Sequence, residues 1–198
     1  MAPIDIAVLV SGSGSNLQAL IDRVDAYRIA VAVADRDGIR ALDRARLAGI
    51  PTRVVPWEGD RARFTTAICD AVEAYGVELV VLAGFMRILG PEAIRRYPGR
   101  IVNIHPSLLP AFPGADAVDQ ALEHAVRVTG VTVHFVDEEV DHGPIIAQVP
   151  VMVMPGDTVE SLHARIQEQE HLLYPNVVSA LARGEIVVGR PPAEVTGT

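Results

Sequence analysis

The sequence predicts an α/β fold in which a mostly parallel sheet carries helices on both faces. Short apolar segments alternate with segments of helical spacing from residue 4 to about residue 105, which is the pattern of βαβ units. Right-handed crossovers place the helices of such units on both faces of the sheet. Two strand-like segments then follow each other without an intervening helix, so we expect an antiparallel C-terminal portion.

The individual elements follow from apolar runs, helical spacing and chain breakers. Apolar and β-branched runs predict strands over 4–10, 28–34, 51–55, 77–82, 100–104, 129–136 and 145–153. Apolar residues spaced three and four apart predict helices over 15–26, 38–48, 60–75, 116–124 and 157–182. A short helix should begin near Pro91, because proline suits the first helical turn. Pro175 should kink or divide the last helix.

Length and composition are those of one globular domain. The chain has 198 residues, of which 49% are hydrophobic, enough for a sizeable core. We expect the domain to span residues 1–190, with residues 191–198 as a flexible tail. The formal net charge of −8 argues against broad nucleic-acid binding, although a locally positive site could still hold a small anion.

The chain shows no targeting or cross-linking signal. No signal peptide and no membrane-length apolar run are visible, so a cytoplasmic protein is expected. Cys69 is the only cysteine and lies in an apolar helical pattern, which predicts a buried hydrophobe without a disulfide. The sequence leaves monomer and homodimer equally open.

The first strand runs into Ser-Gly-Ser-Gly-Ser-Asn-Leu at 11–17, where a helix begins. Unpaired N–H groups and glycines at a helix N-terminus favour a phosphate, although the same residues could simply turn the chain and cap the helix. A dinucleotide site is the rival, because Asp35 ends the second strand about 20 residues later. Leu17 replaces the third glycine of that fingerprint, so we favour a loop or cap role for Asp35.

Asn103 and His105 lie at the end of the fifth strand, where ligands of open α/β sheets bind. Strand alternation points both to one side. An amide that holds an oxyanion and an imidazole that moves protons suit acyl chemistry, although a structural pair is equally compatible with the pattern. Asp141 precedes His-Gly-Pro, which indicates a fixed turn, and its carboxylate near His105 would stabilise the imidazolium.

Other chemistries lack their patterns. Zinc ligands at the usual spacing are absent, and Gly12-Ser13-Gly14 is not a serine nucleophile turn. His105, His134 and His142 could meet in space, but no spacing supports it. We therefore predict no metal site.

Four ordered motifs resemble the phosphoribosylglycinamide formyltransferase family of folate-dependent enzymes. They are residues 11–17, Ala-Gly-Phe-Met-Arg-Ile-Leu at 83–89, Asn-Ile-His-Pro-Ser-Leu-Leu-Pro at 103–110 and Asp-His-Gly-Pro at 141–144. Gln169-Glu170-His171 and Tyr174-Pro175 also match, so the resemblance spans residues 4 to about 188. It implies a single-domain, Rossmann-like formyltransferase fold and formyl transfer from 10-formyltetrahydrofolate to glycinamide ribonucleotide, without a metal.

The resemblance also implies the site residues. It makes Asn103, His105 and Asp141 the catalytic trio. It assigns the substrate phosphate to Gly14, Ser15 and Asn16 and the ribose to Glu170, although a solvated helical carboxylate is the alternative for Glu170. It assigns the folate to Arg61, Met86, Arg87, Ile88, Leu89, Asn103, Val140 and Asp141.

One position departs from the family pattern. The family commonly has histidine two residues after the Pro-Gly of the loop that follows His105, and this chain has Asp116. We expect the 106–115 loop to fold over the site and Asp116 to add negative potential near His105, or else to cap the next helix. The alternatives for the whole chain are formyltetrahydrofolate hydrolase, methionyl-tRNA formyltransferase and a noncatalytic nucleotide- or folate-binding module.

Overall fold

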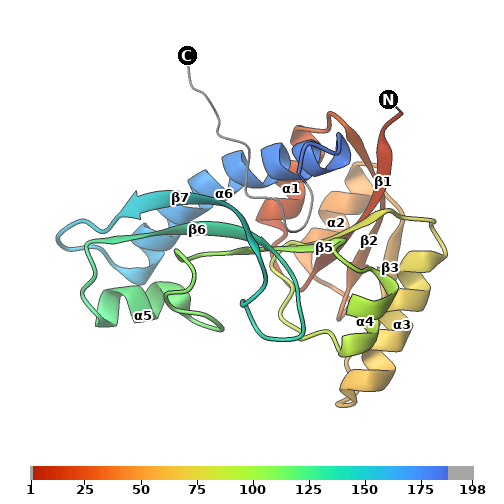
Figure 1. Cartoon of the computed structure of the whole chain (residues 1–198), viewed down its shortest axis with the longest axis horizontal. Coiled ribbons are helices and arrows are strands. Elements are labelled where there is room, and N and C mark those ends of the chain that lie inside the picture. Colours follow the sequence, from red (N-terminus) through yellow and green to blue (C-terminus); the bar gives the residue numbers. More distant parts are fainter. Residues whose placement is uncertain (1, 187–198) are drawn as a thin grey trace.

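The fold is a seven-stranded mixed sheet with helices on both faces (Figure 1). The computed structural model describes residues 2–186. The strand order is β3-β2-β1-β4-β5-β6-β7, parallel from β3 to β5 and antiparallel for β6 and β7. The strands are β1 (Ile4–Val10), β2 (Tyr27–Ala34), β3 (Thr52–Val54), β4 (Leu79–Leu82), β5 (Ile101–His105), β6 (Val128–Phe135) and β7 (Ile145–Met152).

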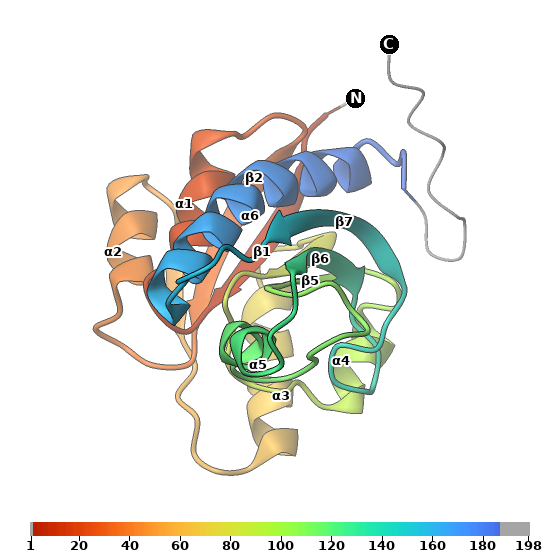
Figure 2. The same ribbon diagram turned by 90° about the vertical axis from the view of Figure 1, so that its left-hand side faces the viewer.

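In the described part of the chain, six helices cover the two faces of the sheet, and a separate apolar cluster lies on each face. The helices are α1 (Ser15–Asp22), α2 (Arg40–Leu47), α3 (Arg61–Glu73), α4 (Pro91–Arg96), α5 (Ala117–Glu123) and α6 (Val159–Ala182). Apolar side chains of α1, α2, α5 and α6 pack with one set of strand residues. Those of α3 and α4 pack with the alternate set, so α6 and α4 lie on opposite sides of the sheet (Figure 2). The predicted mostly parallel sheet with an antiparallel end is confirmed.

Element positions agree with the sequence to within a few residues, with two corrections. The first helix ends at Asp22 rather than at residue 26. Pro175 was predicted to kink or divide the last helix, and division is wrong, because α6 runs unbroken from Val159 to Ala182. Cys69 is buried, as expected. The predicted tail at 191–198 lies outside the described residues.

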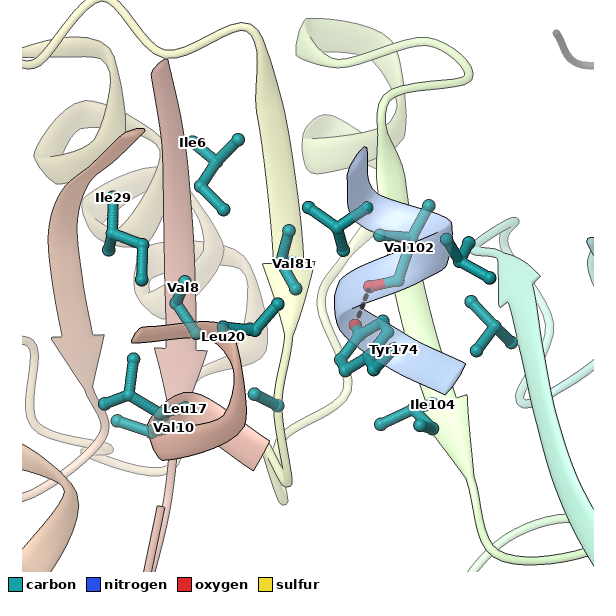
Figure 3. Close-up of a cluster of buried hydrophobic side chains, with 14 of the residues drawn as sticks. Ile6, Val8, Val10, Leu17, Leu20, Ile29, Val81, Val102, Ile104 and Tyr174 are labelled. Atoms are coloured by element: carbon teal, nitrogen blue, oxygen red, sulfur yellow. Dashed lines mark hydrogen bonds between the residues drawn. The ribbon is translucent and has the colours of Figure 1, made fainter. Parts of the chain in front are cut away.

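Tyr174 explains how α6 is held across its proline. Its ring is fully buried, and its hydroxyl donates to the carbonyl oxygen of Leu82 at 2.8 Å and, at 3.2 Å, to that of Val102, the contact drawn in Figure 3. Packing on the sheet therefore compensates for the backbone hydrogen bond that Pro175 cannot make. The hydroxyl thus links the end of β4 to β5 at the residue before Asn103.

Two features are absent from the described residues, 2–186. None of the helices there is long and apolar enough to cross a membrane. Within the same range, no three or more His, Cys, Asp and Glu side chains are arranged to hold a metal ion.

Candidate active site

The fold brings the predicted trio together at the end of β5. The Asn103 amide nitrogen donates to Asp141 Oδ1 at 3.3 Å, and His105 Nδ1 lies 3.3 Å from Asp141 Oδ2. Asn103 and His105 come from β5, whereas Asp141 comes from the loop between β6 and β7. The prediction that these three residues meet is confirmed.

A tight turn fixes Asp141. The residue has a φ of 52°, and the next glycine lies so close to β6 that a Cβ on Gly143 would stand 1.9 Å from the Phe135 carbonyl oxygen. The predicted turn is thus built on close backbone approach. Burial raises the pKa of Asp141, but contacts with His134, Gly114 N–H and His105 outweigh it and leave that pKa below its usual value. Asp141 is therefore an anion facing His105.

His134 belongs to this cluster, and sequence analysis did not assign it a role. Its Nε2 lies 3.2 Å from the Asn103 amide nitrogen and 3.5 Å from Asp141 Oδ1. The antiparallel register of β5 and β6 pairs Asn103 with His134, so strand pairing alone places them side by side. His142 does not join them, because it is exposed and pairs with Asp137 at 2.8 Å.

The loop between β5 and α5 folds over the trio, as predicted. The carbonyl oxygen of Phe112 accepts from His105 Nε2 at 2.8 Å, and the Gly114 N–H donates to Asp141 Oδ2 at 2.8 Å. Asp116 occupies the N-cap position of α5, but it has a φ of 58° and its side chain makes no capping hydrogen bond. The alternative that Asp116 starts the helix is confirmed for its position, but its carboxylate does not cap the helix. The effect of Asp116 on His105 stays a prediction.

The glycine-rich loop follows β1 and leads into the N-terminus of α1. Gly14 is the N-cap with a φ of 72°, and a Cβ there would lie 2.7 Å from Ala41, so only glycine fits. Arg44 of α2 donates from Nε to the Ser13 carbonyl at 3.0 Å. A guanidinium thus lies against the helix N-terminus and makes this part of an acidic protein attractive to a phosphate. Helical spacing gave no sign of this long-range contact.

Glu170 lies beside this loop and is buried, with 5% of its surface exposed. Its Oε2 accepts from the Asn16 amide at 2.9 Å. Burial raises its pKa, and the bond from Asn16 only partly opposes that effect. The alternative of a solvated helical carboxylate is therefore wrong. Within the described residues, the buried Asn16 Oδ1 has no hydrogen-bond partner, which leaves an acceptor beside Glu170.

Four of the predicted folate residues, Met86, Arg87, Ile88 and Leu89, lie in the loop after β4, and Arg61 contacts that loop. Met86 and Ile88 are 70% and 54% exposed, and Val140, the residue before Asp141, is 48% exposed, so these apolar side chains face outward. Leu89 differs, because its side chain is buried in the core. Its carbonyl oxygen accepts from Arg61 Nε at 3.2 Å, so Arg61 supports the loop.

Asp35 anchors the same loop. Its buried carboxylate pairs with Arg87 Nε at 2.8 Å and with Arg36 at 3.4 Å. The Arg87 guanidinium also lies over the Trp57 ring, 5.3 Å from its centroid. Because two arginines occupy the carboxylate, Asp35 is not placed to receive the ribose of a dinucleotide. It acts as an anchor, which refines the expected loop or cap role.

Comparison with known proteins identifies the family of this chain. The family model described as formyl transferase matches residues 4–178. The chain belongs to the formyl transferase family. Among solved structures, glycinamide ribonucleotide transformylase 1 from Symbiobacterium toebii superimposes with a TM-score of 0.90 at 47% identity, covering 95% of this chain and 92% of that one. This agreement confirms the fold predicted for a member of the formyl transferase family.

Curated relatives agree with the structural comparison. The phosphoribosylglycinamide formyltransferase of Escherichia coli is 41% identical over 98% of this chain and 94% of its own length. That of Mycobacterium tuberculosis is 47% identical over 96% of this chain and 90% of its own. The chain also matches 19% of the trifunctional purine biosynthetic protein adenosine-3 of Gallus gallus, at 47% identity. It therefore spans about a fifth of that larger relative.

Proposed function

We propose that this formyl transferase moves the formyl group of 10-formyltetrahydrofolate to the amine of glycinamide ribonucleotide, a step of purine biosynthesis. The single observation that carries the proposal is the cluster of Asn103, His105 and Asp141 at the end of β5, beside β4 and its loop and two strands from the glycine-rich loop that follows β1. Names of full-length relatives support the substrate.

The nucleotide fits the side of the site formed by α1 and α6. Its phosphate would bind the N–H groups of Gly14, Ser15 and Asn16 at the N-terminus of α1, next to Arg44. Its ribose hydroxyls would meet the Glu170 carboxylate. A carboxylate only accepts hydrogen bonds, so a ligand that brings hydroxyl donors suits it.

The folate fits the other side. The exposed apolar side chains of Met86, Ile88 and Val140 offer a surface for a flat ring system. Arg61 and Arg87 place positive charge beside that loop, which suits the carboxylates of a folate tail. The amide of Asn103 and the carboxylate of Asp141 lie where the two substrates would meet.

The chemistry is an acyl transfer. The substrate amine attacks the formyl carbon, a C–N bond forms, and the formyl oxygen becomes an oxyanion. Asn103 would stabilise that oxyanion, and a protonated His105 would do so through its positive charge, because both of its ring nitrogens already face Phe112 and Asp141. Asp141 would stabilise the imidazolium. The amine loses a proton, the folate nitrogen gains one as its C–N bond breaks, and tetrahydrofolate leaves. The residues provide this without a metal or a covalent enzyme intermediate.

Folate release with and without the nucleotide tests the reaction. We expect tetrahydrofolate to accumulate only when both substrates are present. Equal release without the nucleotide would identify a hydrolase, and binding without any release would identify a noncatalytic module. We further propose a cytoplasmic monomer or homodimer with no nucleic-acid partner, which gel filtration and a nucleic-acid binding assay would check.

A further inference from the structure

The side-chain amide of Asn103 is held through its nitrogen. That nitrogen lies 3.2 Å from His134 Nε2 and donates to Asp141 Oδ1 at 3.3 Å. An amide nitrogen carries two hydrogens, and these two neighbours occupy both. The carbonyl oxygen of Asn103 is therefore the end of the amide that remains to face a ligand.

A backbone contact fixes the proton of His134. Nδ1 lies 2.8 Å from the carbonyl oxygen of Phe135, which can only accept, so Nδ1 carries a hydrogen. In the neutral ring, Nε2 then has a lone pair, and it accepts from Asn103. The ring is 1% exposed, so water cannot easily replace this partner.

A second proton on His134 would reverse this arrangement. Nε2 would become a donor facing the donor nitrogen of Asn103 at 3.2 Å. Rotation of the amide relieves this conflict, because Oδ1 then accepts from Nε2. The rotation also takes the amide N–H away from Asp141 Oδ1, and the imidazolium Nε2–H, which lies 3.5 Å from that oxygen, replaces it as a shared donor. Asp141, whose Oδ1 lies 3.5 Å from Nε2, balances the added charge, and His105 flanks the opposite oxygen of that carboxylate. The amide N–H groups are then released toward the ligand side.

We propose that His134 is a positioning residue that selects which end of the Asn103 amide faces the reacting formyl group. The inference rests on the proposed function, because an oxyanion needs the N–H end. With neutral His134, Asn103 presents an oxygen, which can accept an N–H of the incoming amine. With the His134 imidazolium, Asn103 presents a donor to the formyl oxygen.

Side-chain NMR of the ligand-free protein tests the coupling without any activity measurement. The expected result is that the Asn103 amide signals shift with the same midpoint as the His134 ring during a pH titration. In His134→Gln, which places an amide near the Nε2 position without a titrating charge, that midpoint should disappear. Shifts of Asn103 that persist in the variant would overturn the proposal, since they would report only Asp141 or His105.

A double-mutant cycle tests the consequence for turnover. His134→Asn keeps a donor near Nδ1 for the Phe135 carbonyl but removes the group that faces Asn103. Loss of one hydrogen-bonding partner should lower kcat by about tenfold, with little change in either KM. In the Asn103→Ala background the same substitution should have no further effect on kcat. An undiminished loss there would contradict the proposal. Wild-type protein without transfer activity would instead refute the proposed function, and the NMR result would still decide the inference.

Discussion

Glu170→Gln should make the protein more stable and a poorer binder of its nucleotide. The substitution keeps shape and keeps an oxygen for the Asn16 amide, which now lies 2.9 Å from Glu170 Oε2. It removes a charge from a side chain that is 5% exposed. Since burial raises the pKa of Glu170, the folded protein holds that proton to a higher pH than the unfolded chain does.

The sign of the stability effect follows from this difference. Below the unfolded pKa of about 4.3, both states are protonated, and wild type and variant should be equally stable. As the pH rises through the folded pKa, ionisation in a buried site lowers the stability of wild type only. A buried polar group with incomplete hydrogen bonding costs about 1–3 kcal/mol. The variant should therefore melt about 2–10 °C higher near neutral pH.

Binding should change in the opposite direction. Hydrogen bonds from ribose hydroxyls to a charged acceptor contribute about 1.5–3 kcal/mol, so the nucleotide KM should rise about 10- to 150-fold. Thermal unfolding at about pH 4 and about pH 8, together with steady-state kinetics, measures both effects. The control is Glu168→Gln on the exposed face of α6, which should change neither. A Glu170→Gln protein with no stability gain and an unchanged KM would refute the reasoning.

Three further substitutions test other parts of the site. Asp141→Asn should lower turnover by about 10²–10³. Because the pKa of Asp141 is lowered, the variant should also be less stable than wild type at neutral pH. This difference in stability should vanish in acid, where the wild-type carboxylate is protonated. A difference that persists in acid would exclude an electrostatic cause. Asp35→Asn should weaken the ion pair that holds Arg87, so the KM for folate should rise while the KM for the nucleotide stays constant. An unchanged folate KM in steady-state kinetics would exclude a role of this ion pair in folate binding. Tyr174→Phe should destabilise by about 1–2 kcal/mol in chemical unfolding. Tyr97→Phe is the control and should not, because the buried Tyr97 hydroxyl has no partner among the described residues; equal losses would show that the Tyr174 contacts to β4 and β5 add nothing.

The sequence was informative where a local pattern determines structure. Apolar β-branched runs predicted the strands. Alternation along the fifth strand predicted that Asn103 and His105 point to the same side. Gly-Pro after Asp141 gave a fixed turn. These features depend on a few neighbouring residues, so they can be read without knowing the rest of the fold.

Contacts between distant segments were not readable in this way. His134 joins the site through the register of β5 and β6, and a shift of one residue would turn it to the opposite face. The pairing of Asp35 with Arg87 spans 52 residues, and that of Arg44 with Ser13 spans 31. Pro175 does not divide α6, because the packing of α6 on the sheet, which no local pattern shows, offsets the local cost of the proline.

Transfer of a labelled formyl carbon tests the central claim most directly. Folate carrying a ¹³C-formyl group would be mixed with glycinamide ribonucleotide and the protein, and NMR would follow the label. We expect the label to appear on the nucleotide amine as an amide, at a rate that falls at least about 10²-fold in His105→Ala. Label found as free formate, or transferred equally fast by His105→Ala, would contradict formyl transfer by the Asn103, His105 and Asp141 cluster.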